Sequence, residues 1–426
     1  IDQAIANGVI AIDTETNNSL DPITCIIMGG CIYTPGLKNA YIPINHTDLN
    51  GNRLPWQCTE QDLKEQFDRL TSTKIIMHNG KFDYQVIKCT CNCKLTCYWD
   101  TMIAARLLNE NERAGLKNQY IEKIDPSIEK YSIDHLFNNI LYQYVDPEIF
   151  ALYAATDPFM TYKLYELQKE ELTKTDNAKL YSLFMNIEMP LIEVIAEMEL
   201  TGITLDKEYA QRLSTKYYKK ADEVDKKIAA ELAKYESKIL AWRQTADAQK
   251  KPKKKTGEGL GKSKSEQLAD PVEITSSTQL AILLYDILKA PVIDKKTPRG
   301  TGEDILKHME YPICKLILEK RGIEKLINTY IDKLPQCVSE KDGRLHAHFN
   351  QCGTDTGRLS SNSPNLQNIP SHENAIRMLF VAAPGKILVG SDYSQQEPRL
   401  LASYARDEKM IDAYKNGRDL YADIAS

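Results

Sequence analysis

The hydrophobic and polar positions at the start of the chain alternate between short apolar runs and helical patterns. The apolar runs predict strands at residues 9–13, 24–33, 39–44 and 74–79, with Pro35 and Gly36 forming a turn between the second and the third. Helical patterns continue as far as about Gln168. Strands and helices that alternate in this way predict an α/β domain.

After about Lys169 the pattern becomes that of long helices. Runs rich in Lys, Glu, Ala and Leu predict helices at 177–200, 206–235, 276–288 and 312–334. Thr201 and Gly202 supply a helix end after the first, and the Ser and Thr residues of ITSSTQL fit the start of the third. From about Gly343 the character is mixed, with a strand predicted at 387–392 and a helix at 395–404.

A lysine-rich segment, residues 250–264, interrupts the helical patterns. It carries seven lysines and one acidic residue, Glu258, a local charge of +6. Such a segment can grip phosphates, because each neutralised phosphate releases counterions. It fits a solvated linker between two helices equally well, and both interpretations stay open.

The overall composition predicts a large folded protein without a bulk positive charge. Of 426 residues, 42% are hydrophobic and 27% are charged, so a sizeable core is expected. Lys and Arg number 54 and Asp and Glu 59, which gives a net charge of −5. This balance argues against a protein that coats nucleic acid by bulk charge, but it leaves room for a nucleic-acid enzyme rich in carboxylates.

The chain shows no sign of a membrane or secretory segment. No stretch approaches the ~18 apolar residues that cross a bilayer, so no membrane partner is expected, and the N-terminus lacks the pattern of a signal peptide. Ten cysteines fit reduced thiols in a cytoplasmic compartment. Four of them could bind zinc together, although their C-x-C-x-C-x3-C spacing favours reduced thiols on a connecting segment: Cys89, Cys91, Cys93 and Cys97.

Asp13 and Glu15 form the first of three acidic motifs. They lie two residues apart at the end of a predicted strand, so both carboxylates project from one face. Two like charges held close together are costly unless a cation lies between them. The alternative is a solvated strand end.

The second and third motifs each pair two residues four positions apart. Asn79 and Asp83 follow the strand predicted at 74–79, and Tyr153 and Asp157 lie on a predicted helix, where this spacing places both on one face. The alternatives are an N-cap role for Asn79, and a half-buried Tyr153 beside an aspartate that interacts with the helix dipole.

Together the motifs supply four carboxylates and one tyrosine. That set suits two divalent ions about 3.5–4 Å apart, one activating water and one stabilising the leaving oxygen of a phosphodiester, with Tyr153 placed to orient the water. Ligand sets made only of oxygen favour hard cations, so Mg²⁺ or Mn²⁺ is expected, two ions per active site.

In order and spacing, the motifs resemble the DEDD 3′–5′ exonucleases, in the branch that uses tyrosine. The resemblance implies an RNase H-like α/β domain over residues 1–172. It implies that Tyr153 is catalytic, that Asn79 contacts DNA, and that four carboxylates are catalytic metal ligands: Asp13, Glu15, Asp83 and Asp157.

The segment 354–370, TDTGRLSSNSPNLQNIP, is too polar for a core. It gathers Arg358, Asn365, Gln367 and several hydroxyls on a backbone restrained by Gly and Pro. Such groups can bind sugar-phosphate and minor-groove edges. An ordered surface loop satisfied by its own Asx and Ser turns is the alternative.

A last candidate site lies in SDYSQQEPR, residues 391–399. Asp392 ends a predicted strand just before a helix, where a carboxylate is well placed to hold a metal ion. Ser394 and Glu397 have the spacing of a capping box, which is the competing structural account.

These two C-terminal segments closely resemble DNA polymerase family A. TGRLSSNSPNLQNIP is similar to that family's primer-contacting segment and DYSQQEPR to its motif A, which usually has Ile and Leu where this chain has Gln396 and Pro398. The resemblance implies that Asp392, which is catalytic, and the Tyr393 carbonyl bind metal, and that Glu397 excludes the ribose 2′-OH. It implies that the remaining matched residues contact DNA or nucleotide: Arg358, Asn365, Gln367, Gln395 and Tyr421, the last standing where the family usually has His.

The resemblance also implies a domain order. It predicts an exonuclease domain at 1–172, a helical thumb at 173–340 and the N-terminal part of an α+β palm at 341–426. The family's fingers helix and second palm carboxylate would lie beyond Ser426. A complete exonuclease site and half of a polymerase site are therefore expected, with a C-terminal segment or a separate chain supplying the rest.

The leading hypothesis is a replicative DNA-directed DNA polymerase with a proofreading exonuclease. Its partners would be primer–template DNA, single-stranded 3′ ends and dNTPs. The lack of an upstream 5′-nuclease segment fits a phage-type enzyme acting in the host cytoplasm. The alternatives are a dedicated exonuclease with a primer–template binding module, and a non-catalytic DNA-binding subunit, against which the four exonuclease carboxylates argue.

Overall fold

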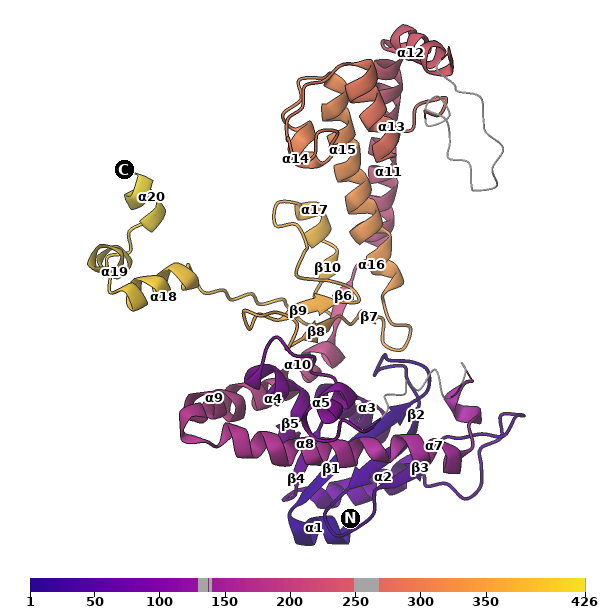
Figure 1. The fold of residues 1–426 in the computed structure, drawn as a ribbon, viewed down its shortest axis with the longest axis vertical. Coiled ribbons are helices and arrows are strands. Elements are labelled where there is room, and N and C mark those ends of the chain that lie inside the picture. Colours follow the sequence, from indigo (N-terminus) through magenta and orange to yellow (C-terminus); the bar gives the residue numbers. More distant parts are fainter. Residues whose placement is uncertain (129–136, 138–139, 249–267, 426) are drawn as a thin grey trace. The chain divides into compact units, whose positions relative to one another are not determined.

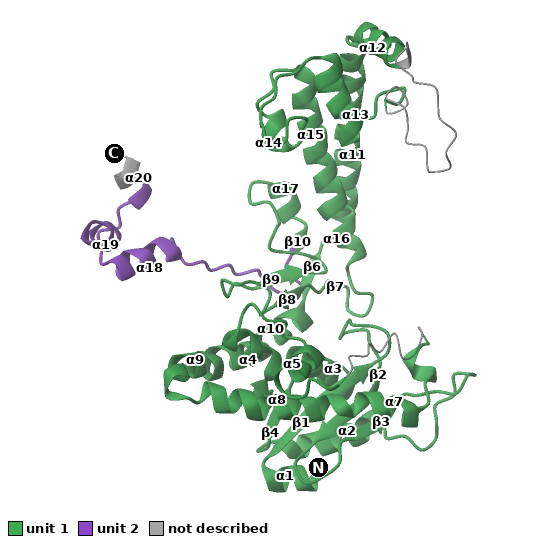
Figure 2. Ribbon diagram, viewed as in Figure 1, with its two compact units in different colours: residues 1–380 green, residues 381–426 purple. Residues whose placement is uncertain are grey.

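The computed structural model describes residues 1–128, 137, 140–248 and 268–425, which are drawn in colour in Figure 1. They form two compact units, residues 1–380 and 381–426 (Figure 2). The lysine-rich segment 250–264 lies outside the described residues, so its phosphate contacts stay a prediction. The domain boundaries expected at 172 and 340 also stay a prediction.

A mixed five-stranded sheet forms the centre of the N-terminal part, in the order β3-β2-β1-β4-β5 (Figure 1). Its strands are β1 (Val9–Thr16), β2 (Ile27–Tyr33), β3 (Ala40–Pro43), β4 (Lys74–Met77) and β5 (Trp99–Asp100). The central strand β1 pairs antiparallel with β2 and parallel with β4. All four strands expected from the apolar runs are confirmed, and β1 continues three residues beyond Asp13.

Helices cover this sheet and complete its core. Helix α8 (Thr156–Leu172) contacts β1, β2 and β4, and α3 (Gly80–Cys91) contacts β1 and β4. Ile10, Ile12 and Ile76 are fully buried between them, which is why the apolar runs form strands. The other helices of this part are α1 (Asp2–Asn7), α2 (Glu60–Phe67), α4 (Thr101–Leu108), α5 (Leu116–Lys123), α7 (Pro147–Ala154), α9 (Ala178–Leu183) and α10 (Met189–Thr201).

The next part is helical, as its pattern predicts. The long helix α11 (Lys207–Ala233) packs along α15 (Pro312–Leu326), with apolar side chains between them (Figure 1). Ser276 caps the helix expected at 276, confirming that start, and Gly202 ends α10 with a left-handed φ of 58°. The other helices are α12 (Glu236–Ala248), α13 (Ser277–Ala281), α14 (Glu303–Leu306), α16 (Lys333–Gln336) and α17 (Asn374–Arg377), and π-helical turns lie at Phe184–Glu188, Ile282–Ile287 and Ile327–Ile331.

Short strands accompany these helices. They are β6 (Ile203–Leu205), β7 (Arg344–Leu345), β8 (His348–Asn350), β9 (Ser360–Asn362) and β10 (Phe380–Val381). β8 and β9 form an antiparallel hairpin in which Phe349 faces Ser361. Glu199, only 3% exposed, accepts hydrogen bonds from the Phe349 amide at 2.5 Å, from Lys81 at 2.5 Å and from Gln85 at 2.7 Å. This buried carboxylate therefore ties α10 and the hairpin to helix α3.

The C-terminal unit contains α18 (Gln396–Ala405), α19 (Glu408–Lys415) and α20 (Leu420–Ala425). The expected helix at 395–404 is confirmed, but the expected strand at 387–392 is wrong. That segment is irregular, with Ile387 83% and Val389 84% exposed. A strand needs a neighbour that satisfies its backbone groups, and none of the described residues pairs with this one.

No helix among the described residues is long and apolar enough to span a bilayer.

Asp100 provides a test of how the loops at the sheet edge are fixed. Its carboxylate is 1% exposed and accepts the backbone N–H groups of Asn79, Gly80, Met102 and Ile103. Because Asp100→Ala leaves several buried donors without an acceptor, we expect a loss of about 2–4 kcal/mol in the free energy of unfolding. Urea unfolding followed by circular dichroism measures this.

Asp146→Ala is the matched control for Asp100→Ala. Asp146 is an exposed N-cap that accepts one N–H, from Glu148, so its loss should cost only about 1 kcal/mol. Equal losses for the two variants would contradict the role given to Asp100.

Candidate active site

Asp13 and Glu15 project together from the central strand β1. In the pairing of β1 with β2, Asp13 lies opposite Cys31 and Glu15 opposite Gly29. One ligand atom from each of Asp13, Glu15 and Cys31 lies within 4.8 Å of the others. The spacing of two residues on a strand therefore does bring both carboxylates to one place, as the sequence indicates.

Asp83 reaches the same place from helix α3, which follows β4. Its Oδ1 accepts the Thr14 backbone N–H at 2.8 Å and the Thr14 hydroxyl at 2.7 Å. These two hydrogen bonds fix the carboxylate against the residue that lies between Asp13 and Glu15. Asn79 is the N-cap of α3 in a left-handed conformation with φ 64°, and its side chain makes no capping hydrogen bond. The N-cap position is confirmed, but the capping role is not.

Tyr153 and Asp157 belong to two helices rather than one, so the expectation of a single helix is wrong. Tyr153 lies near the end of α7 and Asp157 in the first turn of α8, and the helices meet at Ala155. Lys117 of α5 nevertheless links them: its Nζ lies 2.7 Å from the Tyr153 Oη and 3.4 Å from the Asp157 Oδ2. The same ammonium lies 3.9 Å from the centroid of the Tyr153 ring.

The electrostatics show that all three motifs converge. Burial, and then repulsion from Asp83, Glu15 and Asp157, raises the pKa of Asp13 well above its usual value. Burial and the charge of Asp157 raise the pKa of Glu15 to about 8. Burial raises the pKa of Asp83 to about 7, against the two Thr14 hydrogen bonds, which lower it. Acids that are partly buried and repel Asp13 and Glu15 in this way form a site for positive charge.

The donor set fits a divalent cation. Carboxylate oxygens from β1, α3 and α8 surround the site, and oxygen ligands favour hard cations. Cys31 is less suited, because burial and the neighbouring carboxylates raise the pKa of its thiol and keep it protonated. A divalent ion bound here would offset both the cost of burying the charges of Asp13 and Glu15 and their repulsion by the neighbouring carboxylates.

Two grooves are lined in part by the β8–β9 hairpin. The first, of about 830 Å³, is lined by Asn79, Phe82, Arg106 and Arg113 together with hairpin residues. The second, of about 1140 Å³, is lined by basic and amide side chains, including Lys325, Lys333, Asn365 and Asn368.

The polar segment 354–370 satisfies part of its own hydrogen bonding, as its alternative account expects. Asn365 accepts the Gln367 N–H at 3.0 Å, and the Gln367 side chain donates to the Leu359 carbonyl at 2.9 Å. The Thr354 hydroxyl donates to the Arg358 carbonyl at 2.7 Å. Arg358, Asn365 and Gln367 all remain exposed, so these local bonds do not bury them.

The candidate residues of the C-terminal unit lie on its surface. Asp392 is exposed, Tyr393 is 79% exposed and Tyr421 is 60% exposed. The competing account, a capping box of Ser394 and Glu397 at the start of this helix, is wrong, because Gln395, with φ 51°, is the N-cap of α18 and makes no side-chain cap. Glu397 lies in the first turn of the same helix.

Two other clusters are structural in character. Cys91, Cys93 and Cys97 are buried in the core of the N-terminal part, and Cys89 is half-buried on α3.

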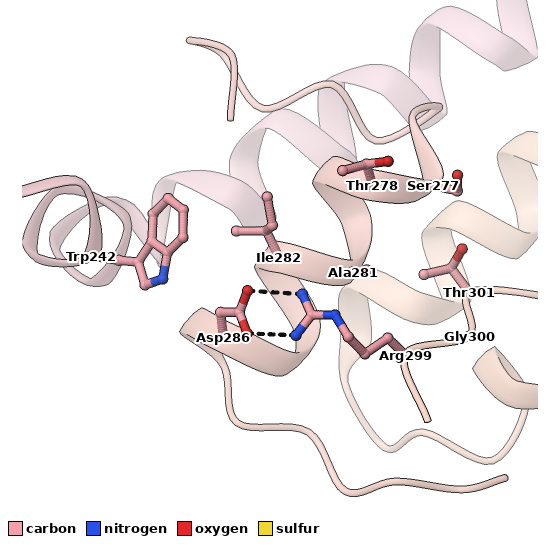
Figure 3. A pocket seen from close by; sticks show the side chains of 9 residues that line it. All are labelled: Trp242, Ser277, Thr278, Ala281, Ile282, Asp286, Arg299, Gly300 and Thr301. Atoms are coloured by element: carbon pink, nitrogen blue, oxygen red, sulfur yellow. Dashed lines mark hydrogen bonds and ion pairs between the residues drawn. The ribbon is translucent and has the colours of Figure 1, made fainter. Parts of the chain in front are cut away.

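A hollow of about 620 Å³ lies beside α13, where Arg299 and Asp286 form a bidentate ion pair at 2.7 and 2.8 Å (Figure 3). The charged side chains that line this hollow, Asp286 and Arg299, are therefore paired with each other.

Comparisons with known proteins agree with this geometry. Residues 2–173 match the family described as 3′-5′ exonuclease, and residues 243–426 match DNA polymerase family A. The chain belongs to DNA polymerase family A and carries a 3′-5′ exonuclease domain. Enzymes of this family generally depend on divalent metal ions, which agrees with the donor set.

Named relatives extend the match over almost the whole chain. DNA polymerase I of Chloroflexus aurantiacus is 32% identical over 98% of this chain and 41% of its own length. DNA polymerase I of Borreliella burgdorferi is 30% identical over 98% of this chain and 42% of its own length. The chain therefore spans about two fifths of the length of these relatives.

A solved structure has a similar fold. The POL domain of Pol1 from M. smegmatis, in complex with DNA primer-template and dNTP, aligns with a TM-score of 0.67 at 22% identity, covering 96% of this chain and 61% of that one. This likeness confirms the fold class expected from the sequence.

Sequence reasoning missed three residues of the site: Thr14, Cys31 and Lys117. Thr14 lies between the two carboxylates and could have been found from its position. Cys31 and Lys117 reach the site through strand pairing and through the packing of α5 on α8, which no local pattern reveals.

The raised pKa values predict how stability depends on pH and metal. Glu15 and Asp83 prefer the protonated form in the folded chain, so their contribution to stability is complete below about pH 4 and is lost as pH rises through 7 and 8. A divalent ion favours the ionised form, so Mg²⁺ should stabilise the chain more at pH 8 than at pH 6. The expected gain is about 2.7 kcal/mol at 100 times Kd.

Thermal unfolding at both pH values, with and without Mg²⁺, measures this effect. In the double variant Asp13→Asn with Glu15→Gln, the neutral amides should abolish the stabilisation by Mg²⁺. They should also remove most of the dependence of the chain's stability on pH. Equal stabilisation of the variant and the wild-type chain would place the metal elsewhere.

Proposed function

We propose that the chain is the proofreading 3′–5′ exonuclease, thumb and first palm portion of a replicative DNA-directed DNA polymerase. One observation carries the exonuclease assignment. Acidic residues from β1, α3 and α8, far apart in sequence, meet with Tyr153 at one edge of the central sheet: Asp13 and Glu15 project from one strand, the Asp83 carboxylate binds Thr14 between them, and Lys117 contacts both Tyr153 and Asp157.

The proposed reaction is hydrolysis of the terminal phosphodiester of a DNA strand. The oxygen of a water molecule bonds to phosphorus while the bond from phosphorus to the 3′ oxygen breaks. A proton from water ends on that oxygen, and the products are a 5′-mononucleotide and a strand one nucleotide shorter. When bound, two Mg²⁺ or Mn²⁺ ions would supply a Lewis acid for the attacking and the leaving oxygen.

The chain's own residues have defined tasks in this proposal. Asp13, Glu15, Asp83 and Asp157 hold the ions, and Thr14 fixes the orientation of Asp83. The Tyr153 phenol orients the attacking water. Burial and the nearby carboxylates raise the pKa of Tyr153 above its ordinary value, so it acts as a neutral hydrogen-bond donor.

We assign the groove beside Asn79 to the single-stranded 3′ end. Its wall combines the Phe82 ring, on which a base can stack, with the cationic side chains of Arg106 and Arg113. This combination binds single strands with little sequence preference, as proofreading requires.

The second groove and the segment 354–370 would contact primer–template DNA. Lys325 and Lys333 offer charge to phosphates, while exposed Arg358, Asn365 and Gln367 suit sugar and minor-groove edges.

In the C-terminal unit, Asp392 and the Tyr393 carbonyl would hold the polymerase metal, Glu397 would exclude the ribose 2′-OH, and Gln395 and Tyr421 would contact the incoming dNTP or DNA. Because motif A supplies only one carboxylate of a two-metal site, we propose that a further segment or a separate chain supplies the second and the fingers.

The exonuclease assignment predicts the effect of removing two ligands. Asp13→Ala with Glu15→Ala should lower the rate at which a 5′-labelled single strand is shortened from its 3′ end by more than about 100-fold, because the metal site is lost. Asp392→Ala serves as the matched control, since it removes a carboxylate outside this site and should leave degradation unchanged. A double variant that still degrades DNA normally would sink the proposal.

The polymerase assignment predicts a difference between binding and synthesis. With Asp13→Ala and Glu15→Ala present to prevent degradation, the chain should bind primer–template yet fail to extend it with dNTPs. Adding the missing palm and fingers as a separate chain should restore extension, and Asp392→Ala should abolish the restored activity. Robust extension by the chain alone would show that the site is already complete.

A further inference from the structure

Lys117 is a cation placed inside the carboxylate cluster. It lies on α5, its side chain is 20% exposed, and Asp157 beside it is 15% exposed. Its Nζ is 2.7 Å from the Tyr153 Oη, 3.4 Å from the Asp157 Oδ2 and 3.9 Å from the Tyr153 ring centroid. Three separate contacts hold one ammonium against the two residues of the third motif.

The direction of the hydrogen bond has a chemical consequence. An ammonium group has three donors and no acceptor, so the Tyr153 oxygen must accept from Lys117. The phenol's own hydrogen is then directed to another acceptor. Without the lysine, the phenol could turn and donate to a neighbouring carboxylate such as Asp157 instead.

Lys117 is surrounded mainly by groups of the proposed active site. The groups facing it include Tyr153 and Asp157, and its charge also acts on Asp13 and Glu15 across the site. Its neighbour on the same helix, Lys123, makes an ordinary partly exposed ion pair with Glu112 at 2.7 Å. The structure thus distinguishes a site lysine from a surface lysine within one short helix.

We infer that Lys117 is a positioning residue of the exonuclease: it fixes the Tyr153 phenol as a donor toward the attacking water or the scissile phosphate. This inference rests on the proposed exonuclease function and names a residue that the three motifs do not contain. Lys117 acts through Tyr153 and need not touch the reacting atoms. Its loss should therefore slow turnover without weakening DNA binding.

A double-mutant cycle tests this coupling. Lys117→Met keeps the side-chain length and removes the charge, and Tyr153→Phe removes the hydroxyl. Each should lower kcat for single-strand degradation by about 10-fold or more with KM within about twofold, because misplacing a group that orients the reacting atoms can cost up to about 100-fold. The double variant should be no slower than the slower single variant, since both changes remove the same contact.

A metal titration gives a second readout that does not depend on activity. Removing a cation beside Asp157 should let the metal-free chain bind Mn²⁺ several-fold more tightly, measured by electron paramagnetic resonance. Tighter binding together with slower turnover is the expected signature. Weaker Mn²⁺ binding in Lys117→Met would mean that the lysine only holds the site together, and would overturn the inference.

Lys123→Met is the matched control and should leave kcat, KM and Mn²⁺ binding unchanged. Unchanged turnover in Lys117→Met, or losses that multiply in the double variant with a rise in KM, would overturn the positioning role. A wild-type chain that releases no nucleotides under any divalent ion would overturn the proposed function itself. A wild-type chain that degrades DNA no faster than Lys117→Met overturns the inference alone.

Discussion

Repulsion within a cluster of four carboxylates, one buried and three half-buried, is the constraint on which the N-terminal part depends. Burial, and then repulsion from Asp83, Glu15 and Asp157, raises the pKa of Asp13, and burial together with the charge of Asp157 raises that of Glu15. Such a group of acids persists in a fold only when other interactions hold it in place and a cation can compensate it. Lys117 supplies part of that compensation within the chain, and the oxygen ligands leave the rest to a divalent ion.

The backbone around the site meets this constraint with hydrogen bonds rather than with apolar contacts. Thr14 holds Asp83 through its amide and its hydroxyl. Asp100 holds the turn that begins α3 through two backbone N–H groups and the first turn of α4 through two more. Glu199 carries the same principle to the next part of the chain, because it joins Lys81 on α3 to the Phe349 amide of the β8–β9 hairpin. The hairpin is thereby joined to the helix that carries Asp83. This is a physical link between the proposed exonuclease site and a segment that we propose contacts the primer.

The segments that form their expected strands bury their apolar side chains, whereas the segment 387–392, where the expected strand is absent, leaves its apolar side chains exposed. The run at 74–79 forms β4 because its side chains fill the core between β1 and β5, whereas the equally apolar run at 387–392 has no neighbour among the described residues and stays irregular. Tyr153 and Asp157 show a related limit. Their spacing predicts a shared helix face, yet a turn at Ala155 divides the helix, and Lys117 of a third helix contacts both residues.

The sequence by itself determined the α/β character of the first part, the helical character of the second, and the identities of all four carboxylates and the tyrosine. The α/β and helical characters follow from strand and helix periods, which are local properties of the chain. The carboxylates and the tyrosine were identified because their motifs resemble, in order and spacing, those of the DEDD exonucleases. Only the tertiary structure decided that Cys31 faces Asp13, that Asp100 fixes the turn at Asn79, and that Lys117 lies against Tyr153. Those contacts join residues between about 20 and 40 positions apart, and long-range pairing is set by how the elements pack and not by any pattern within them.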